Sequence, residues 1–89
     1  MQSKNKKSMT AAERRHVERV KQGPCAVCGA AGPTEAHEIE QGAWFVSVSL
    51  CADCHRGSKN GLHGQKAMWK VMKLNELGAL NNTLARILA

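Results

Sequence analysis

Four cysteines are the residues in this chain whose type and spacing most clearly indicate chemistry. They form two Cys-x2-Cys pairs separated by 22 residues, namely Cys25, Cys28, Cys51 and Cys54. Two residues between cysteines allow both thiolates to bind one ion from a single tight turn. Four thiolates suit a tetrahedral Zn²⁺ and close its coordination sphere, so the pattern predicts a structural zinc.

Disulfides are the alternative use of four cysteines, and the N-terminal sequence disfavours them. They persist in oxidising compartments, whereas the first residues, MQSKNKKSMTAAERR, contain no apolar run that could serve as a secretory signal. No stretch approaches the length of a membrane-spanning helix. We therefore expect a cytoplasmic protein, without a membrane partner, whose thiols bind metal.

Three further residues near the cysteine pairs could bind a second metal ion. His37 lies on an expected strand, His55 directly follows the second pair, and His63 lies eight residues further on. Neutral imidazole is a good ligand for first-row divalent ions, so the three rings could hold a catalytic cation. The alternative is that His55 only supports the zinc site and His63 is a loop residue. The remaining histidine, His16, lies apart and is expected to be solvated or partly packed.

The net charge of +6 is distributed as two basic flanks around an acidic centre. Residues 1–24 carry +5, residues 25–55 carry −4 and residues 56–89 carry +5. Lysine and arginine neutralise phosphates and release counterions, which gives salt-sensitive DNA binding with little sequence specificity. We expect DNA contacts from five basic residues after the second cysteine pair, with a solvated surface as the alternative: Arg56, Lys59, Lys66, Lys70 and Lys73.

Upstream of the cysteines, local signals predict an arm and a helix. Residues 1–9 are polar and lysine-rich and are expected to form a disordered basic arm. Thr10 and Glu13 form a capping box, which predicts a helix over residues 11–22 within a unit spanning 10–23. This helix is expected to dock lightly, through Val17 and Val20.

Between the two cysteine pairs, residues 35–40 and 44–50 are predicted to form two strands joined by a short turn. The second strand alternates between two faces, so Ser47 and Ser49 share one of them. An ordinary solvent-facing position is expected for Ser49. The hairpin would hold His37 close to the second cysteine pair.

Helical periodicity is predicted from Gln65 onward. In the first segment the lysines form a stripe at i, i+4 and i+7, opposite an apolar face of Met68, Trp69, Val71 and Met72. Asn75 can cap a last helix, whose apolar residues are expected to pack in the core: Leu77, Leu80, Leu84, Ile87 and Leu88.

Only 3% of the 89 residues are aromatic, so burial alone would stabilise this fold poorly. Chains of this size usually need disulfides or a metal to compensate for a small core. We therefore predict a small zinc-stabilised α+β fold over residues 24–89, preceded by the helix and the arm. Its expected order is zinc knuckle, β-hairpin, second knuckle and two C-terminal helices.

The segments AHEI, LCADCH and GLHG, together with the first Cys-x2-Cys pair, resemble the HNH or ββα-metal endonucleases. The resemblance covers residues 24–89 and is closest to small phage nucleases of the recombination-enhancement, or Ref-like, type. It implies a treble-clef-like ββα-metal fold in which the four cysteines hold zinc. It also implies that His55 and His63 bind a catalytic divalent ion with a residue of the first strand.

The resemblance leaves the general base open, because the family commonly has two adjacent functional residues on that strand. Here the sequence is Ala36-His37-Glu38. His37 is either the base, which the ordinary pKa of a histidine side chain, near working pH, favours, or a ligand, with Glu38 in the base position. Adjacent strand residues point to opposite faces, so both can serve only at a strand end or bulge.

The family's asparagine is also replaced, since the chain has VSVS before LCADCH. Ser47 or Ser49 would have to provide its orienting hydrogen bond. The resemblance implies a metal-dependent DNA endonuclease that leaves a 5′ phosphate and a 3′ hydroxyl, using Mg²⁺, Mn²⁺, Ni²⁺ or Zn²⁺. Recombination or DNA processing, with a recombinase as a possible partner, is the implied context. The alternative is a non-catalytic zinc module that binds DNA or a protein, and the oligomeric state stays open.

Overall fold

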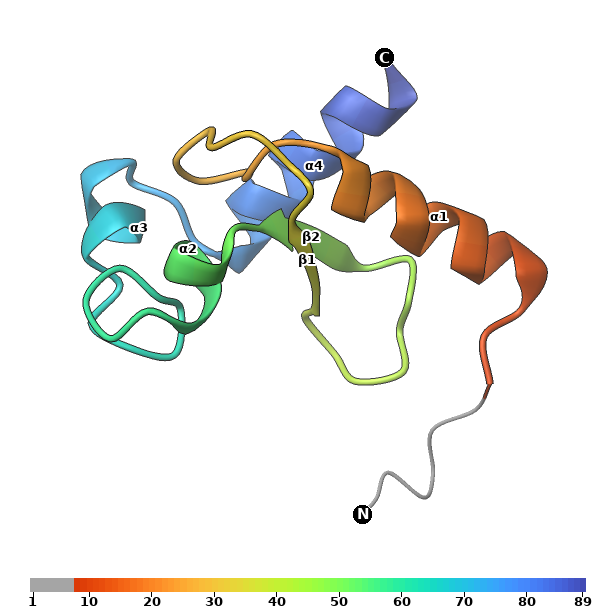
Figure 1. The fold of residues 1–89 in the computed structure, drawn as a ribbon, viewed down its shortest axis with the longest axis horizontal. Helices are drawn as coiled ribbons and strands as arrows, with labels where there is room; N and C mark the ends of the chain where they lie inside the picture. Colours follow the sequence, from red (N-terminus) through yellow and green to blue (C-terminus); the bar gives the residue numbers. More distant parts are fainter. Residues whose placement is uncertain (1–7) are drawn as a thin grey trace.

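The computed structural model describes residues 8–89, so most of the predicted basic arm lies outside the described residues. It is an α+β fold with one two-stranded antiparallel hairpin and four helices among those residues. In chain order the elements are α1 (Ala11–Gln22), β1 (Glu35–Glu38), β2 (Ser47–Leu50), α2 (Ala52–Arg56), α3 (Ala67–Val71) and α4 (Glu76–Leu88). Figure 1 shows the hairpin at the centre, with α1 on one side of it and α2 and α3 on the other.

The predicted N-terminal helix is confirmed over its full range. The Thr10 hydroxyl accepts the Glu13 N–H at 3.1 Å, and the Glu13 carboxylate accepts the Thr10 N–H at 2.7 Å. This capping box satisfies two of the backbone donors that a helix start leaves unpaired. Val17 and Val20 are the buried residues of α1, and they attach it to the hairpin.

The hairpin is shorter than predicted, and its serine face is not exposed. β1 pairs with β2 in a register that places His37 opposite Val48. Ser47 and Ser49 are both fully buried, which corrects the expectation that Ser49 faces solvent. The reason is that α1 and α4 both pack against β2 and exclude water from it. The Ser49 hydroxyl donates to the Pro24 carbonyl at 2.8 Å, which satisfies this buried polar group.

The core forms around two of the cysteines. Its buried members are Cys25, Val27, Val48, Leu50, Cys54, Trp69 and Ala79. Trp69 is the largest of them, and its indole N–H donates to the Cys54 carbonyl at 2.9 Å. This bond fixes α3 to α2, so the packing of the C-terminal half depends on the position of the second cysteine pair.

The first C-terminal helix is shorter than its sequence pattern predicts. Lys66 precedes α3 with a left-handed φ of 59°, and Lys73 follows it with a φ of 57°. The three lysines therefore do not form a stripe along one helix, although all are exposed. Val71 and Met72 were predicted on the apolar face but are 70% and 49% exposed, because a helix of five residues buries only the turn that carries Trp69.

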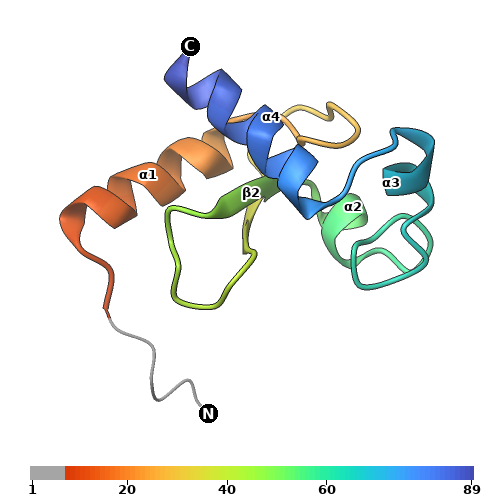
Figure 2. The same cartoon turned by 180° about the vertical axis from the view of Figure 1, so that it is seen from behind.

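The last helix also departs from its prediction in one respect. Asn75 caps α4, with its side chain accepting the Gly78 N–H at 2.8 Å. Figure 2 shows α4 lying across the hairpin, and its buried residues are Ala79 and Thr83. Leu77 and Leu88 were expected in the core but are 71% and 77% exposed, because the face with small residues approaches β2 instead. Within residues 8–89, none of the helices combines the length and apolar character needed to cross a bilayer.

Candidate functional site

The four cysteines converge from two segments into one group, here called the cysteine cluster. Their sulfur atoms all lie within 4.8 Å of one another, and none is in a disulfide. The Sγ atoms of Cys28 and Cys51 are 3.8 Å apart. A tetrahedron with Zn–S bonds of about 2.3 Å has edges of about 3.8 Å, so this spacing fits a zinc ion. The cluster can hold a metal ion, as predicted, in agreement with a structural zinc.

Backbone N–H groups orient the cysteine sulfurs. The Val27 N–H donates to Cys25 Sγ at 3.4 Å, and the Cys54 N–H donates to Cys51 Sγ at 3.3 Å. Gly29 closes the first turn with a φ of 79°, a conformation that a residue without a Cβ adopts easily. The two turns are thus built in a way that favours negative charge on sulfur.

The pKa values of the thiols show why this arrangement suits a cation. Burial opposes the ionisation of Cys25, but backbone hydrogen bonds, chiefly at Cys28, outweigh it and lower its pKa to about 7. The pKa of Cys54 is raised by burial and then by the nearby charge of Cys25, and burial also raises that of Cys51. A divalent cation would remove this mutual repulsion and allow all four sulfurs to ionise.

The three predicted histidines also converge, into what is here called the histidine cluster. His37 comes from β1, His55 from α2, and His63 from the loop before α3. One nitrogen of each ring lies within 4.8 Å of the others. The ring centroids are 5.1 Å apart for His37 and His55, 5.7 Å for His37 and His63, and 5.5 Å for His55 and His63. His16 takes no part and packs against Phe45 at a centroid distance of 5.4 Å.

Two rings of the histidine cluster are held by carboxylates that the sequence did not indicate. His55 Nδ1 lies 2.7 Å from Glu35, and His37 Nε2 lies 2.7 Å from Glu76. Hydrogen bonds from Arg56 and then from His55 lower the pKa of Glu35 to about 2. Carboxylates commonly support metal-binding imidazoles in this way, because they fix the ring orientation and increase its basicity.

A shallow hollow of about 310 Å³ opens beside the histidine cluster. It is lined by Ala36, His37, Glu38, Gln41 and His55. Glu38 is the last residue of β1, and its carboxylate accepts the Gly42 N–H at 2.8 Å. His37 and Glu38 therefore lie at a strand end, where two adjacent residues can both contribute to one site.

Neither serine of the second strand orients a histidine. The Ser47 hydroxyl donates to the Trp44 carbonyl at 2.6 Å, while that of Ser49 is shared between Pro24 and Thr34. The expectation that one of them provides the orienting hydrogen bond of the HNH asparagine is therefore wrong. No local signal could have identified Glu76, because it lies 39 residues from His37 and resembles an ordinary acidic residue in a first helical turn.

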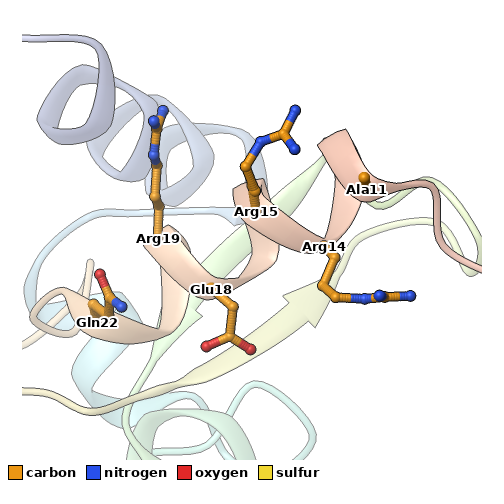
Figure 3. A pocket seen from close by; sticks show the side chains of 6 residues that line it. All are labelled: Ala11, Arg14, Arg15, Glu18, Arg19 and Gln22. Atoms are coloured by element: carbon orange, nitrogen blue, oxygen red, sulfur yellow. The ribbon is translucent and has the colours of Figure 1, made fainter.

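The predicted DNA-binding residues occupy different surroundings. Lys59, Lys66, Lys70 and Lys73 are exposed, whereas Arg56 donates to both carboxylate oxygens of Glu35. A second basic surface, not predicted, lies along α1 beside a hollow of about 500 Å³. Figure 3 shows Arg15 and Arg19 on one side of α1, with Arg14 and Glu18 on the other.

Comparisons with protein-family models, with curated proteins and with solved structures found no match to this chain. Any function assigned to it therefore depends on the chemistry of its own residues, above all on the cysteine and histidine clusters.

Proposed function

We propose that this protein is a metal-dependent DNA endonuclease of the HNH type, with low sequence specificity. The observation that carries the proposal is the convergence of His37, His55 and His63, two of which are backed by carboxylates. A purely structural zinc module has no need for three imidazoles that meet from a strand, a helix and a loop. The proposed context of this activity is recombination or DNA processing, with a recombinase as partner.

The order of the elements supports the finer assignment of a treble-clef-like ββα-metal domain. The first cysteine pair precedes β1, the second follows β2, and α2 begins directly after Cys51. A zinc ion on the cysteine cluster would hold the hairpin against α2. His37 and His55 lie on these two elements, so the same ion would indirectly fix the distance between them.

The contacts favour His37 as a ligand, which is one of the two roles that the sequence left open. Its ring takes part in the cluster with His55 and His63, and a carboxylate holds it from behind. Glu38 then takes the position of the general base. Glu38 lines the same hollow as His37, and its carboxylate would accept a proton from the attacking water.

A divalent ion bound by the histidine cluster would supply Lewis-acid stabilisation to the scissile phosphate and to the leaving 3′ oxygen. The chain's own contribution is to place the imidazole rings, to orient the water through Glu38, and to bind the flanking phosphates. Arg56 contributes indirectly, since its guanidinium neutralises Glu35 and thereby fixes the carboxylate that holds His55. The products are a 5′ phosphate and a 3′ hydroxyl.

Exposed lysines that follow α2 in the chain provide the proposed phosphate contacts. We expect the double substitution Lys59→Gln and Lys70→Gln to weaken DNA binding and to reduce its salt dependence. Each lost phosphate contact changes the slope of log K against log salt by about 0.9, so the pair should change it by about 2. Fluorescence anisotropy with a labelled duplex at several salt concentrations measures this.

The matched control for this change is Gln65→Ala, which alters an exposed neighbour without removing charge. It should leave both the affinity and the slope at their wild-type values. An unchanged slope in the lysine double variant would show that these lysines form a solvated surface away from DNA.

The experiment that tests the endonuclease compares the wild type with His55→Ala on supercoiled plasmid. Mg²⁺, Mn²⁺ and Ni²⁺ are each added to protein that contains one zinc per chain. The wild type should convert supercoiled to nicked DNA with at least one metal, and the variant should not, because it lacks one imidazole of the cluster. Absence of nicking with every metal, or equal nicking by both proteins, would contradict the proposal.

The non-catalytic zinc module is the second candidate, favoured by one observation. The chain lacks the asparagine of the motif, and the hydroxyls of Ser47 and Ser49 are bonded elsewhere. Such a module would bind DNA in the anisotropy experiment without nicking the plasmid, so the two assays together separate the candidates.

A further inference from the structure

The first turn of α4 reaches the histidine cluster through one side chain. His37 Nε2 and Glu76 Oε2 are 2.7 Å apart, and their side chains are 12% and 39% exposed. This contact joins the hairpin to the C-terminal helix across 39 residues of sequence. The bond is direct and partly shielded from water, which strengthens a hydrogen bond to a charged acceptor.

From this contact we infer that Glu76 is the positioning residue of His37, in place of the motif's asparagine, which this chain lacks. The inference rests on the proposed ion site and names the residue that prepares it. In this role Glu76 acts only through the imidazole ring that it contacts.

The contact determines which nitrogen of His37 is available to an ion. An imidazole that donates its Nε2–H to a carboxylate keeps its free lone pair on Nδ1. His55 is held in the opposite sense, since its Nδ1 faces Glu35 and its Nε2 is left for a ligand. The two carboxylates thus fix the tautomer and the rotation of two of the three rings before any ion binds.

The two serine hydroxyls of β2 are bonded to backbone carbonyls and do not reach His37. The Ser47 hydroxyl donates to Trp44, and the Ser49 hydroxyl donates to Pro24. The hairpin therefore supplies no side-chain hydroxyl to hold the His37 ring. The orienting bond comes from α4, which gives the last helix a role in the site as well as in packing.

A simpler explanation must be separated from this one. An acidic residue in the first turn stabilises any helix through its dipole, by about 0.3–1 kcal/mol. Glu76 would then serve only α4, and its contact with His37 would be incidental. Glu76→Gln separates the two explanations. The stability of the protein should change little in either case, but its affinity for the ion should fall only if Glu76 positions His37.

Calorimetric titration of the zinc-loaded protein with Ni²⁺ tests the inference without DNA. We expect Glu76→Gln to weaken Ni²⁺ binding about 10–100-fold, the usual effect of losing such a supporting carboxylate, with one zinc retained per chain. Glu40→Gln is the matched control, because it removes the same charge from an exposed position near the hairpin. It should bind Ni²⁺ like the wild type.

A measurement on the unmodified protein covers the case in which Glu76→Gln unfolds. Long-range ¹H–¹⁵N spectra of the zinc-loaded wild type, without Ni²⁺, should show His37 as the Nε2–H tautomer. The Nδ1–H tautomer, or equal Ni²⁺ affinity for the wild type and Glu76→Gln, would overturn the role of Glu76. Absence of Ni²⁺ binding by the wild type would instead contradict the ion site itself, so the two failures are distinguishable.

Discussion

Replacing Cys25 with serine is expected to abolish zinc binding by the cysteine cluster and to unfold the protein. Cys25 is 3% exposed and belongs to the core cluster, so its loss leaves a hydroxyl among apolar residues as well as an incomplete metal site. Structural zinc binding in small domains contributes about 10–16 kcal/mol, whereas the net stability of a domain is about 5–15 kcal/mol. The free energy lost with the ion is therefore as large as, or larger than, the free energy of unfolding of such a domain.

Zinc content and circular dichroism measure this result, and Trp69 adds a local signal. Its indole donates to the Cys54 carbonyl, so its fluorescence should shift as the second cysteine pair is released. A chelator should produce the same change in the wild type, and added Zn²⁺ should reverse it. The substitution and the chelator should have the same effect, because zinc stabilises the protein by binding only to its folded state.

Ala52→Ser is the matched control for this substitution. Ala52 is an exposed residue inside the second Cys-x2-Cys pair, so the change adds a hydroxyl without touching a sulfur. It should retain zinc, fold and thermal midpoint. A Cys25→Ser protein that stays folded without metal would show that the hydrophobic core is sufficient, contrary to the small aromatic content of the chain.

Local signals predicted the elements whose causes are local. The capping box at Thr10 determines where α1 begins, and two residues between cysteines are enough to predict the metal turns. The convergence of the three histidines could be proposed from their positions beside these turns. The reason is that the two cysteine pairs flank the hairpin in sequence and meet in one cluster.

Long-range packing explains what the sequence could not predict. Ser49 is buried because α4, more than 25 residues later, lies on β2 and its Thr83 hydroxyl accepts the Ser49 N–H at 3.2 Å. Glu76 likewise meets His37 only once α4 has docked. The prediction of a lysine stripe was wrong for a local reason. Lys66 and Lys73 adopt positive φ values, which hydrophobic periodicity does not reveal, so they lie outside α3.

Replacing Glu38 with glutamine is expected to reduce DNA cleavage about 10²–10⁴-fold, the usual contribution of a general base. Glutamine keeps an oxygen that can accept the Gly42 N–H, so the end of β1 should retain its geometry. It cannot accept a proton from water at neutral pH. Ni²⁺ affinity should stay at its wild-type value, because the imidazoles of the histidine cluster are intact.

His37→Ala is the informative partner of this variant. It removes a proposed ligand, so it should lose both Ni²⁺ binding and cleavage, whereas Glu38→Gln should lose cleavage alone. Plasmid nicking and calorimetry on the same zinc-loaded preparations measure the two properties. Glu40→Gln, which neutralises an exposed carboxylate two residues further on, should change neither of them.

The opposite pattern of binding and cleavage would make His37 the general base in place of Glu38. If Glu38→Gln cleaves normally while His37→Ala binds Ni²⁺ but does not cleave, then His37 is the base and the ion is held by His55 and His63 with another group. In that case Glu76 would stabilise the imidazolium that forms when His37 takes a proton, as a carboxylate behind a catalytic histidine does. The 2.7 Å contact with Glu76 suits either role, so the ligand role of His37 rests on its convergence with His55 and His63, and the separation of Ni²⁺ binding from cleavage tests it.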